Sequence, residues 1–128
     1  MKTNNMKTDF KQEIFDKVAK HLLTQKARCT DSKTGSCLYF DPETKMKCAA
    51  GCLIPDRDYS KLFEGQHVFY SLRVTGFFLD SGYSNNEMQL IFELQMIHDT
   101  RFPPSWKKEL TMLAKRHAIN YDILESFQ

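Results

Sequence analysis

The residues with the clearest capacity for chemistry are four cysteines that lie close together in the chain: Cys29, Cys37, Cys48 and Cys52. A structural zinc site needs four ligands that converge at about 2.3 Å, and it usually draws them from two Cys-x2-4-Cys pairs. Only Cys48 and Cys52 have a spacing near that pattern. The sequence therefore favours small buried thiols and no cofactor, with a four-cysteine zinc site as the alternative.

A cysteine nucleophile is a second chemical possibility, because Cys48 and Cys52 flank the small residues 49–51. Such small residues also allow another backbone or a ligand to approach closely. A nucleophilic thiol needs a base within hydrogen-bond reach and a lowered pKa. The candidate bases are His67, His98 and His117. The alternative role of His98 is a favourable interaction with the C-terminal end of a helix dipole. Its neighbour Asp99 is not its automatic partner, since adjacent helical residues point in different directions.

A loop that follows Pro55 gathers acidic and aromatic residues, and loops carry a large share of functional residues. We expect ligand contacts from Tyr39, Asp56, Arg57, Tyr59 and Glu64. The alternative is structural: Asp56 caps a turn and Tyr59 anchors the loop to the core. The sequence contains no phosphate-binding glycine loop, no His-Glu-x-x-His pair and no Gly-x-Ser-x-Gly elbow.

Two stretches of the chain carry a family resemblance. The first is Lys47-Cys-Ala-Ala-Gly-Cys-Leu-Ile-Pro-Asp-Arg-Asp-Tyr59, and the second is Leu94-Gln-Met-Ile-His-Asp99 followed by Pro104-x-Trp106. Together they resemble a family of uncharacterised small bacterial and bacteriophage proteins. The resemblance implies a compact helical domain with a hairpin that carries residues 48–56, in a bacterial or phage-infected cytoplasm. It implies no activity, and Cys29 falls outside its motifs, which weakens the zinc alternative.

The elements that position these residues begin with a helix. Phe10, Ile14, Val18 and Leu22 recur at a spacing of four and predict a helix over residues 9–26, with Asp9 and Gln12 as a capping box. After it, strands at 37–40 and 45–48 around a turn at 41–44 predict a β-hairpin.

The second half of the chain reads as helical. We expect a short helix within 63–78, a central helix that Ser84 and Glu87 cap, a helix that opens at Pro103 and stops near Asn120, and a final turn over 121–127. The predicted fold class is α+β, mainly α: an N-terminal helix, a β-hairpin insert and three to four packed helices. Residues 1–8 are expected to be a disordered leader and residues 9–128 a single globular domain, without an internal repeat.

Composition narrows the class of function. Of 128 residues, 18 are Lys or Arg and 16 are Asp or Glu. The resulting net charge of +2 does not favour a nucleic-acid-binding protein, because phosphate binding needs several clustered cations. No segment approaches the ~18 apolar residues of a membrane span, and the N-terminus lacks the apolar stretch of a signal peptide. We therefore expect a cytoplasmic protein without a membrane partner.

The leading functional hypothesis is a non-enzymatic binding module for a protein partner or a small ligand. One alternative is a phage anti-defence protein that sequesters a nucleotide signal through Tyr39, Tyr59, Arg57 and Arg28. The other is a Cys–His enzyme that uses Cys48 or Cys52 with His98. A homodimer is a further hypothesis, based on apolar patches at Phe77, Phe78 and Phe127.

Overall fold

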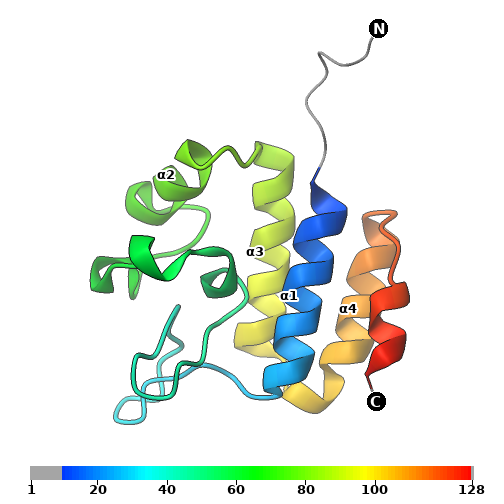
Figure 1. Cartoon of the computed structure of the whole chain (residues 1–128), viewed down its shortest axis with the longest axis horizontal. Helices are drawn as coiled ribbons and strands as arrows, with labels where there is room; N and C mark the ends of the chain where they lie inside the picture. The colour runs from blue at the N-terminus through cyan, green and yellow to red at the C-terminus, as the bar shows by residue number, and fades with distance from the viewer. Residues whose placement is uncertain (1–9, 128) are drawn as a thin grey trace, which may run out of the picture.

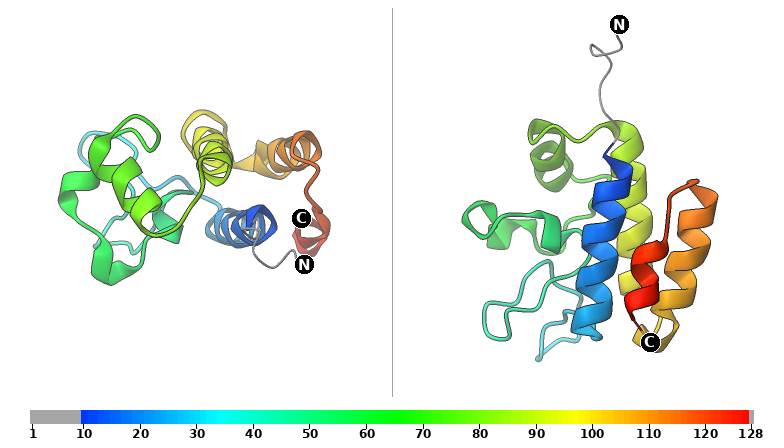
Figure 2. Two further views of the ribbon diagram at one scale, coloured as in Figure 1. Left: turned by 90° about the horizontal axis from the view of Figure 1, so that it is seen from above. Right: turned by 45° about the vertical axis from the view of Figure 1, so that its right-hand side comes forward.

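The computed structural model describes residues 10–127, within which four α-helices build the fold. They are α1 (Lys11–Gln25), α2 (Leu72–Asp80), α3 (Asn85–Thr100) and α4 (Trp106–Arg116). Helices α1, α3 and α4 form a three-helix bundle in which each pair is in contact, and the segment 26–71 lies with α2 on one side of it (Figures 1 and 2). None of the described helices combines the length and apolar character that a membrane span requires.

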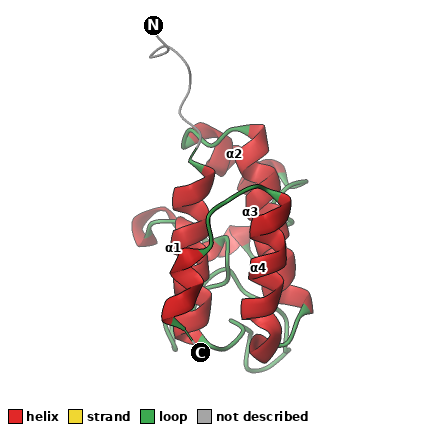
Figure 3. Cartoon of the chain, turned by 90° about the vertical axis from the view of Figure 1, so that its right-hand side faces the viewer, coloured by secondary structure: helices red, strands yellow, loops and turns green. Residues whose placement is uncertain are grey.

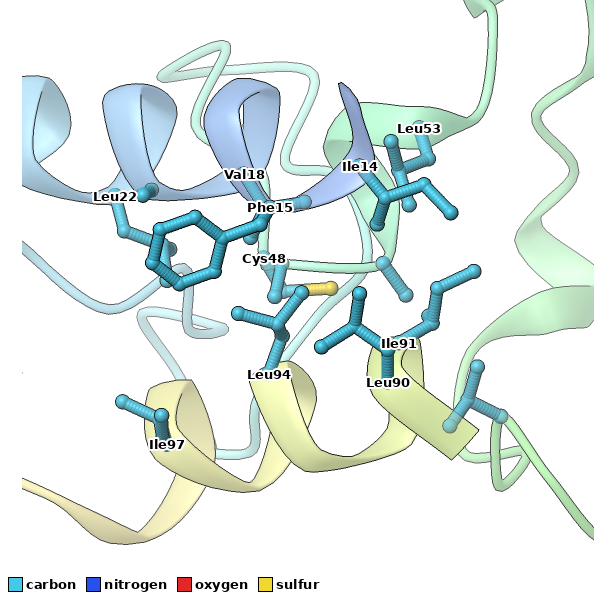
Figure 4. Close-up of a cluster of buried hydrophobic side chains, with 14 of the residues drawn as sticks. Ile14, Phe15, Val18, Leu22, Cys48, Leu53, Leu90, Ile91, Leu94 and Ile97 are labelled. Carbon is cyan, nitrogen blue, oxygen red and sulfur yellow. The ribbon is translucent and has the colours of Figure 1, made fainter. Parts of the chain in front are cut away.

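The core forms where the apolar stripe of α1 meets α3. Ile14, Phe15, Val18 and Leu22 face Leu90, Leu94 and Ile97 across the interface, with Cys48 and Leu53 at its edge (Figure 4). The predicted N-terminal helix is confirmed over Lys11–Gln25. Its expected cap, Asp9, lies outside the described residues, as does the expected leader. Gln12 bonds instead to the Asn120 carbonyl (2.8 Å).

The predicted β-hairpin is wrong, because the described residues contain no β-strand and the fold class is all-α rather than α+β (Figure 3). In the segment that connects α1 to α2, β-type backbone pairing is limited to two isolated antiparallel bridges, Thr30 with Cys37 and Phe40 with Lys47.

The segment folds instead into two consecutive loops of equal length, the first loop (residues 29–38) and the second loop (residues 39–48). In the first loop, Leu38 N donates to Cys29 O (2.8 Å), Asp31 N to Ser36 O (2.8 Å) and Gly35 N to Asp31 O (2.8 Å). The corresponding three bonds recur in the second loop, where Cys48 N donates to Tyr39 O (3.2 Å), Asp41 N to Met46 O (3.0 Å) and Lys45 N to Asp41 O (2.7 Å). Gly35 and Lys45 both have positive φ, +77° and +67°. This is a structural repeat that the sequence analysis missed, since the two loops share little beyond an Asp-x-x-Thr pattern.

Side chains from other elements explain why no ladder extends from the bridges. The Glu64 carboxylate accepts from the N–H groups of Tyr39 (2.9 Å) and Phe40 (3.3 Å). Gln25 accepts from Lys47 N (3.0 Å) and donates to Lys47 O (2.9 Å). The backbone N–H and C=O groups with which the two predicted strands would extend their pairing therefore already have side-chain hydrogen-bond partners.

The small residues 49–51 do allow a close backbone approach, at Gly51. A Cβ built on Gly51 would lie 2.0 Å from the carbonyl oxygen of Tyr39. The second loop is thus seated directly on the short 3-10 helix η2 (Gly51–Leu53).

The helices of the second half begin at their capping residues. α2 starts late in the predicted 63–78 range because the Ser71 hydroxyl accepts from Arg73 N and Val74 N (both 3.2 Å). The capping box of α3 is confirmed: Ser84 Oγ accepts from Glu87 N (3.1 Å) and Glu87 accepts from Ser84 N (2.8 Å). Pro103 opens η5 (Pro103–Ser105), and α4 follows directly. Helix α4 ends at Arg116, before the predicted stop at Asn120, and Ala118 just beyond it has a φ of +56°.

Candidate functional site

The C-terminal half of α3 directs three polar side chains at the loops: Gln95, His98 and Asp99. His98 is fully buried and stacks on Trp106, with ring centroids 5.7 Å apart. Its Nε2 accepts from the backbone N–H of Cys29 (2.9 Å). The proton of the neutral ring must therefore be on Nδ1, which donates to Asp99 Oδ1 (2.7 Å).

Gln95 and Cys37 complete the network around Asp99. Gln95 Nε2 donates to Asp99 Oδ1 (2.9 Å), while Gln95 Oε1 accepts from Ala50 N (2.8 Å). Burial, the charge of Asp99 and a hydrogen bond to its carboxylate, in that order, raise the pKa of the Cys37 thiol to about 11. Cys37 is therefore a protonated thiol near neutral pH. The network joins the first loop and the start of η2 to α3.

A small pocket of about 140 Å³ opens onto this network, and we name it the Asp99 pocket. Its lining residues are Cys37, Leu38, Tyr39, Cys48, Gly65, Gln66, His67, Val68, Phe92, Gln95, Met96 and Asp99. Asp99 is one-third exposed, so its carboxylate is both held by the network and accessible from the pocket.

Cys37, His98 and Asp99 also form a group whose potential metal-ligating atoms lie within 4.8 Å of one another. The hydrogen bonds argue against a metal there. A cation bound through Nδ1 would need the lone pair that here carries a proton, because Nε2 uses its own lone pair for the Cys29 N–H. The donor set does not fit a metal ion.

The four cysteines do not come together as a ligand group in the part of the chain that the structure describes. Cys29 donates to Met46 O (3.2 Å) and Cys52 to Ala49 O (3.1 Å), whereas Cys48 accepts from Gly51 N (3.2 Å). Cys29 and Cys48 are buried and Cys37 and Cys52 are partly buried, and three of these four thiols bond to nearby backbone.

The proposed thiol nucleophiles are not paired with a base. Burial raises the pKa of Cys52 to about 12 and that of the fully buried Cys48 well above its usual range. Both ring nitrogens of His98 are engaged by Cys29 and Asp99. The Cys–His enzyme stays a prediction that these contacts do not favour. The partnership of His98 with Asp99 and Cys37 is what the sequence analysis missed, although the spacing of four between Gln95 and Asp99 placed those two on one helix face.

Of the five predicted ligand contacts, Tyr39, Tyr59 and Glu64 are joined by hydrogen bonds, whereas Asp56 and Arg57 make other contacts. Glu64 accepts from the Tyr59 hydroxyl (2.7 Å) as well as from the second loop, so Tyr59, Glu64 and the buried Tyr39 hold the fold together. Burial and, next, the hydrogen bond to Glu64 raise the pKa of Tyr59. Asp56 pairs with Lys47 (2.6 Å), and this hydrogen bond lowers its pKa.

Arg57 alone of the five lines the cleft between α1, α2 and the Leu53–Asp58 segment, a space of about 480 Å³. The charged side chains of this cleft are Lys17 and Arg57 on the positive side and Glu13, Asp58 and Glu87 on the negative side. A surplus of carboxylates is unfavourable for a phosphate group. Arg28 lies elsewhere, over the Phe102 ring (5.5 Å), so the four residues of the nucleotide hypothesis do not share one pocket.

An exposed apolar surface borders the Asp99 pocket. Tyr70 is 80% exposed and Leu72 is 96% exposed, and both line one groove with Gln66, which also lines the Asp99 pocket. The His67 ring lies between Tyr70 (4.9 Å) and Phe92 (5.2 Å), measured between ring centroids. We name this surface the aromatic patch: His67, Phe69, Tyr70, Leu72, Phe92 and Met96.

The residues on which the dimer hypothesis rests are less exposed than Tyr70 and Leu72. Phe78 is fully buried, and Phe77 and Phe127 pack partly buried against the core. The predicted exposure is therefore wrong for Phe78, while Phe77 and Phe127 keep part of their surface exposed.

Comparison with known proteins adds no relative: no family model, curated protein or solved structure matches the chain. The interpretation of the site rests on its own geometry.

Proposed function

We propose that the protein is a non-enzymatic binding module whose protein partner docks on the aromatic patch. The observation that carries this proposal is the exposure of Tyr70 and Leu72, two large apolar side chains on either side of Ser71, where α2 begins. Single exposed apolar residues are ordinary, but a contiguous patch around a pocket marks an interaction surface. Aromatic residues are also the anchors most enriched at protein interfaces.

The chemistry of the described residues supports binding over catalysis. All four thiols have raised pKa values, so none is an activated nucleophile. Every buried side-chain polar atom among residues 10–127 has a hydrogen-bond partner. A site for proton transfer would be expected to keep such a group available for substrate.

The size of the Asp99 pocket favours a protein partner over a small ligand. Pockets that enclose drug-sized molecules measure about 300–1,000 Å³. The Asp99 pocket, at about 140 Å³, is suited to one side chain. The larger cleft beside Arg57 has walls of mixed charge.

Site-specific photo-crosslinking tests the proposal. We would place p-benzoylphenylalanine at position 72 in one variant and at position 112 in a matched control, since Met112 is also exposed and apolar but lies on α4. Expressed in bacterial cells, the setting that the family resemblance implies, the first variant is expected to give a discrete heterologous adduct that Tyr70→Ser weakens. No adduct, or the same adduct from both positions, would refute the proposal. An adduct of twice the chain mass would identify a second copy as the occupant instead.

A further inference from the structure

We propose that the Asp99 pocket receives the guanidinium group of an arginine side chain from the partner. The inference rests on the proposed function, because the arginine would belong to the protein that docks on the aromatic patch. It adds the chemical identity of the group that the partner must present.

The charge of Asp99 lacks a cationic partner within residues 10–127. The ion-pair distance to His98 (2.7 Å) joins the carboxylate to a neutral ring, because His98 Nε2 accepts a hydrogen bond and leaves the ring one proton. Gln95 and Cys37 are likewise neutral donors. Arg28, which lies near Cys37, donates its guanidinium N–H groups to the carbonyls of His98 (3.1 Å) and Arg101 (2.8 Å).

The Asp99 carboxylate also has one oxygen that no nitrogen donor among the described residues reaches. Both hydrogen bonds from nitrogen donors end on Oδ1. In the described part of the chain, Oδ2 therefore has no nitrogen donor. A partly buried carboxylate in this state gains from a charged donor more than an exposed one, because solvent screens it less.

The walls of the pocket select guanidinium over ammonium. Phe92, Met96 and the His67 ring surround the approach to Asp99. A guanidinium is flat, weakly hydrated and able to stack on aromatic faces, whereas a lysine ammonium is strongly hydrated and loses more on entering an apolar space. The alkyl stem of the arginine would pass over Met96, which is 41% exposed at the rim.

The test is an NMR titration with two synthetic peptides, acetyl-Ala-Arg-Ala-amide and its citrulline counterpart, which keeps the shape of arginine without its charge. The readouts are the Met96 methyl signal and the Gln95 side-chain amide, which bonds directly to Asp99. We expect saturable shifts with the arginine peptide and binding weaker by roughly tenfold or more with citrulline. Equal binding of the two peptides, or no shift with either, would overturn the inference.

Two variants make the result specific to Asp99. Met96→Lys places a cation three residues before Asp99 on the same helix face, where it competes for the carboxylate, and Met96→Gln is the uncharged control. We expect Met96→Lys to abolish arginine binding and Met96→Gln to retain it. Asp99→Asn, checked by thermal unfolding, should remove the preference for arginine over citrulline. Retention of the preference in both Met96→Lys and Asp99→Asn would contradict the assignment.

The peptide test and the crosslinking test can fail separately. Peptide discrimination without an adduct from position 72 would leave the arginine pocket and refute the docking surface. An adduct from position 72 without peptide discrimination would keep the binding module and refute the arginine.

Discussion

Replacing Gly51 with alanine puts a methyl group into space that backbone already occupies. The new Cβ would lie 2.0 Å from the Tyr39 carbonyl oxygen and 2.9 Å from its carbon, so the two segments must move apart by about 1.4 Å to reach the 3.4 Å at which ordinary contact begins. The Tyr39 segment cannot move freely, because Glu64 binds its N–H (2.9 Å) and Cys48 N binds its carbonyl (3.2 Å).

The expected cost combines overpacking with a weakened hydrogen bond. Overpacking of a well-packed interior costs ~1–3 kcal/mol, and the hydrogen bond from Cys48 N to Tyr39 O contributes ~1 kcal/mol. We therefore expect Gly51→Ala to lower the free energy of unfolding by ~2–4 kcal/mol. At ~4 °C per kcal/mol for a chain of this size, the melting temperature should fall by ~8–16 °C.

The assay is urea and thermal unfolding followed by far-UV circular dichroism, with Gly76→Ala as the matched control. Gly76 lies inside α2, and a Cβ there meets nothing within 4 Å. Alanine is the better helix former, so this control should stabilise the protein by ~0.5–1 kcal/mol. The two glycine substitutions are thus expected to have opposite signs. A Gly51→Ala variant within ~1 kcal/mol of the original protein would refute the reasoning about this contact.

Four further predictions concern the network around α3 and the partly buried His21. His98→Phe keeps an aromatic ring against Trp106 but leaves the Cys29 N–H unpaired, so it should cost ~2–4 kcal/mol in denaturant unfolding. Asp99→Asn removes the charge that helps to raise the pKa of Cys37, so that pKa should fall and iodoacetamide should label Cys37 faster at pH 8, as measured by mass spectrometry. Burial lowers the pKa of His21; since the unfolded chain then binds the proton more readily, stability should decline as pH falls below ~6.5, and His21→Gln should reduce that decline. Native mass spectra of protein purified without chelators should show no bound zinc, because the proton on His98 Nδ1 occupies the ligand position; a one-zinc adduct that Cys37→Ser removes would contradict this.

Local sequence signals predicted the helices well, and their failure at the loops has a physical cause. The stripe of α1 and the Ser84–Glu87 capping box depend on residues within a few positions of each other, so the pattern itself contains the interaction. Residues 37–48 look like two strands and a turn, yet their pairing groups are captured by Gln25 and Glu64. A single sequence gives no sign of such a distant competitor.

The same limit applies to the candidate site. The cysteines and His98 could be recognised as chemically capable residues, but their roles depend on partners far away in the chain, as between His98 and Cys29. Tyr59 and Glu64 looked like ligand contacts because polar and aromatic residues in a loop suit either role. The aromatic patch was not predicted, because the exposure of Tyr70 and Leu72 depends on where α2 begins, and the sequence placed that helix only within 63–78.

The two tandem loops also set an order of events during folding. Each loop closes its own neck with local hydrogen bonds, but the side chains that hold the loops in place include Glu64 and His98, which follow the loops in the chain. A chain that emerges from the ribosome therefore presents both loops well before α3 exists to receive them. Contacts of such high sequence separation form late, after the closure entropy of the intervening segment has been overcome. The Asp99 pocket, which takes Gln95 and Asp99 from α3, is thus completed only after α3 has formed.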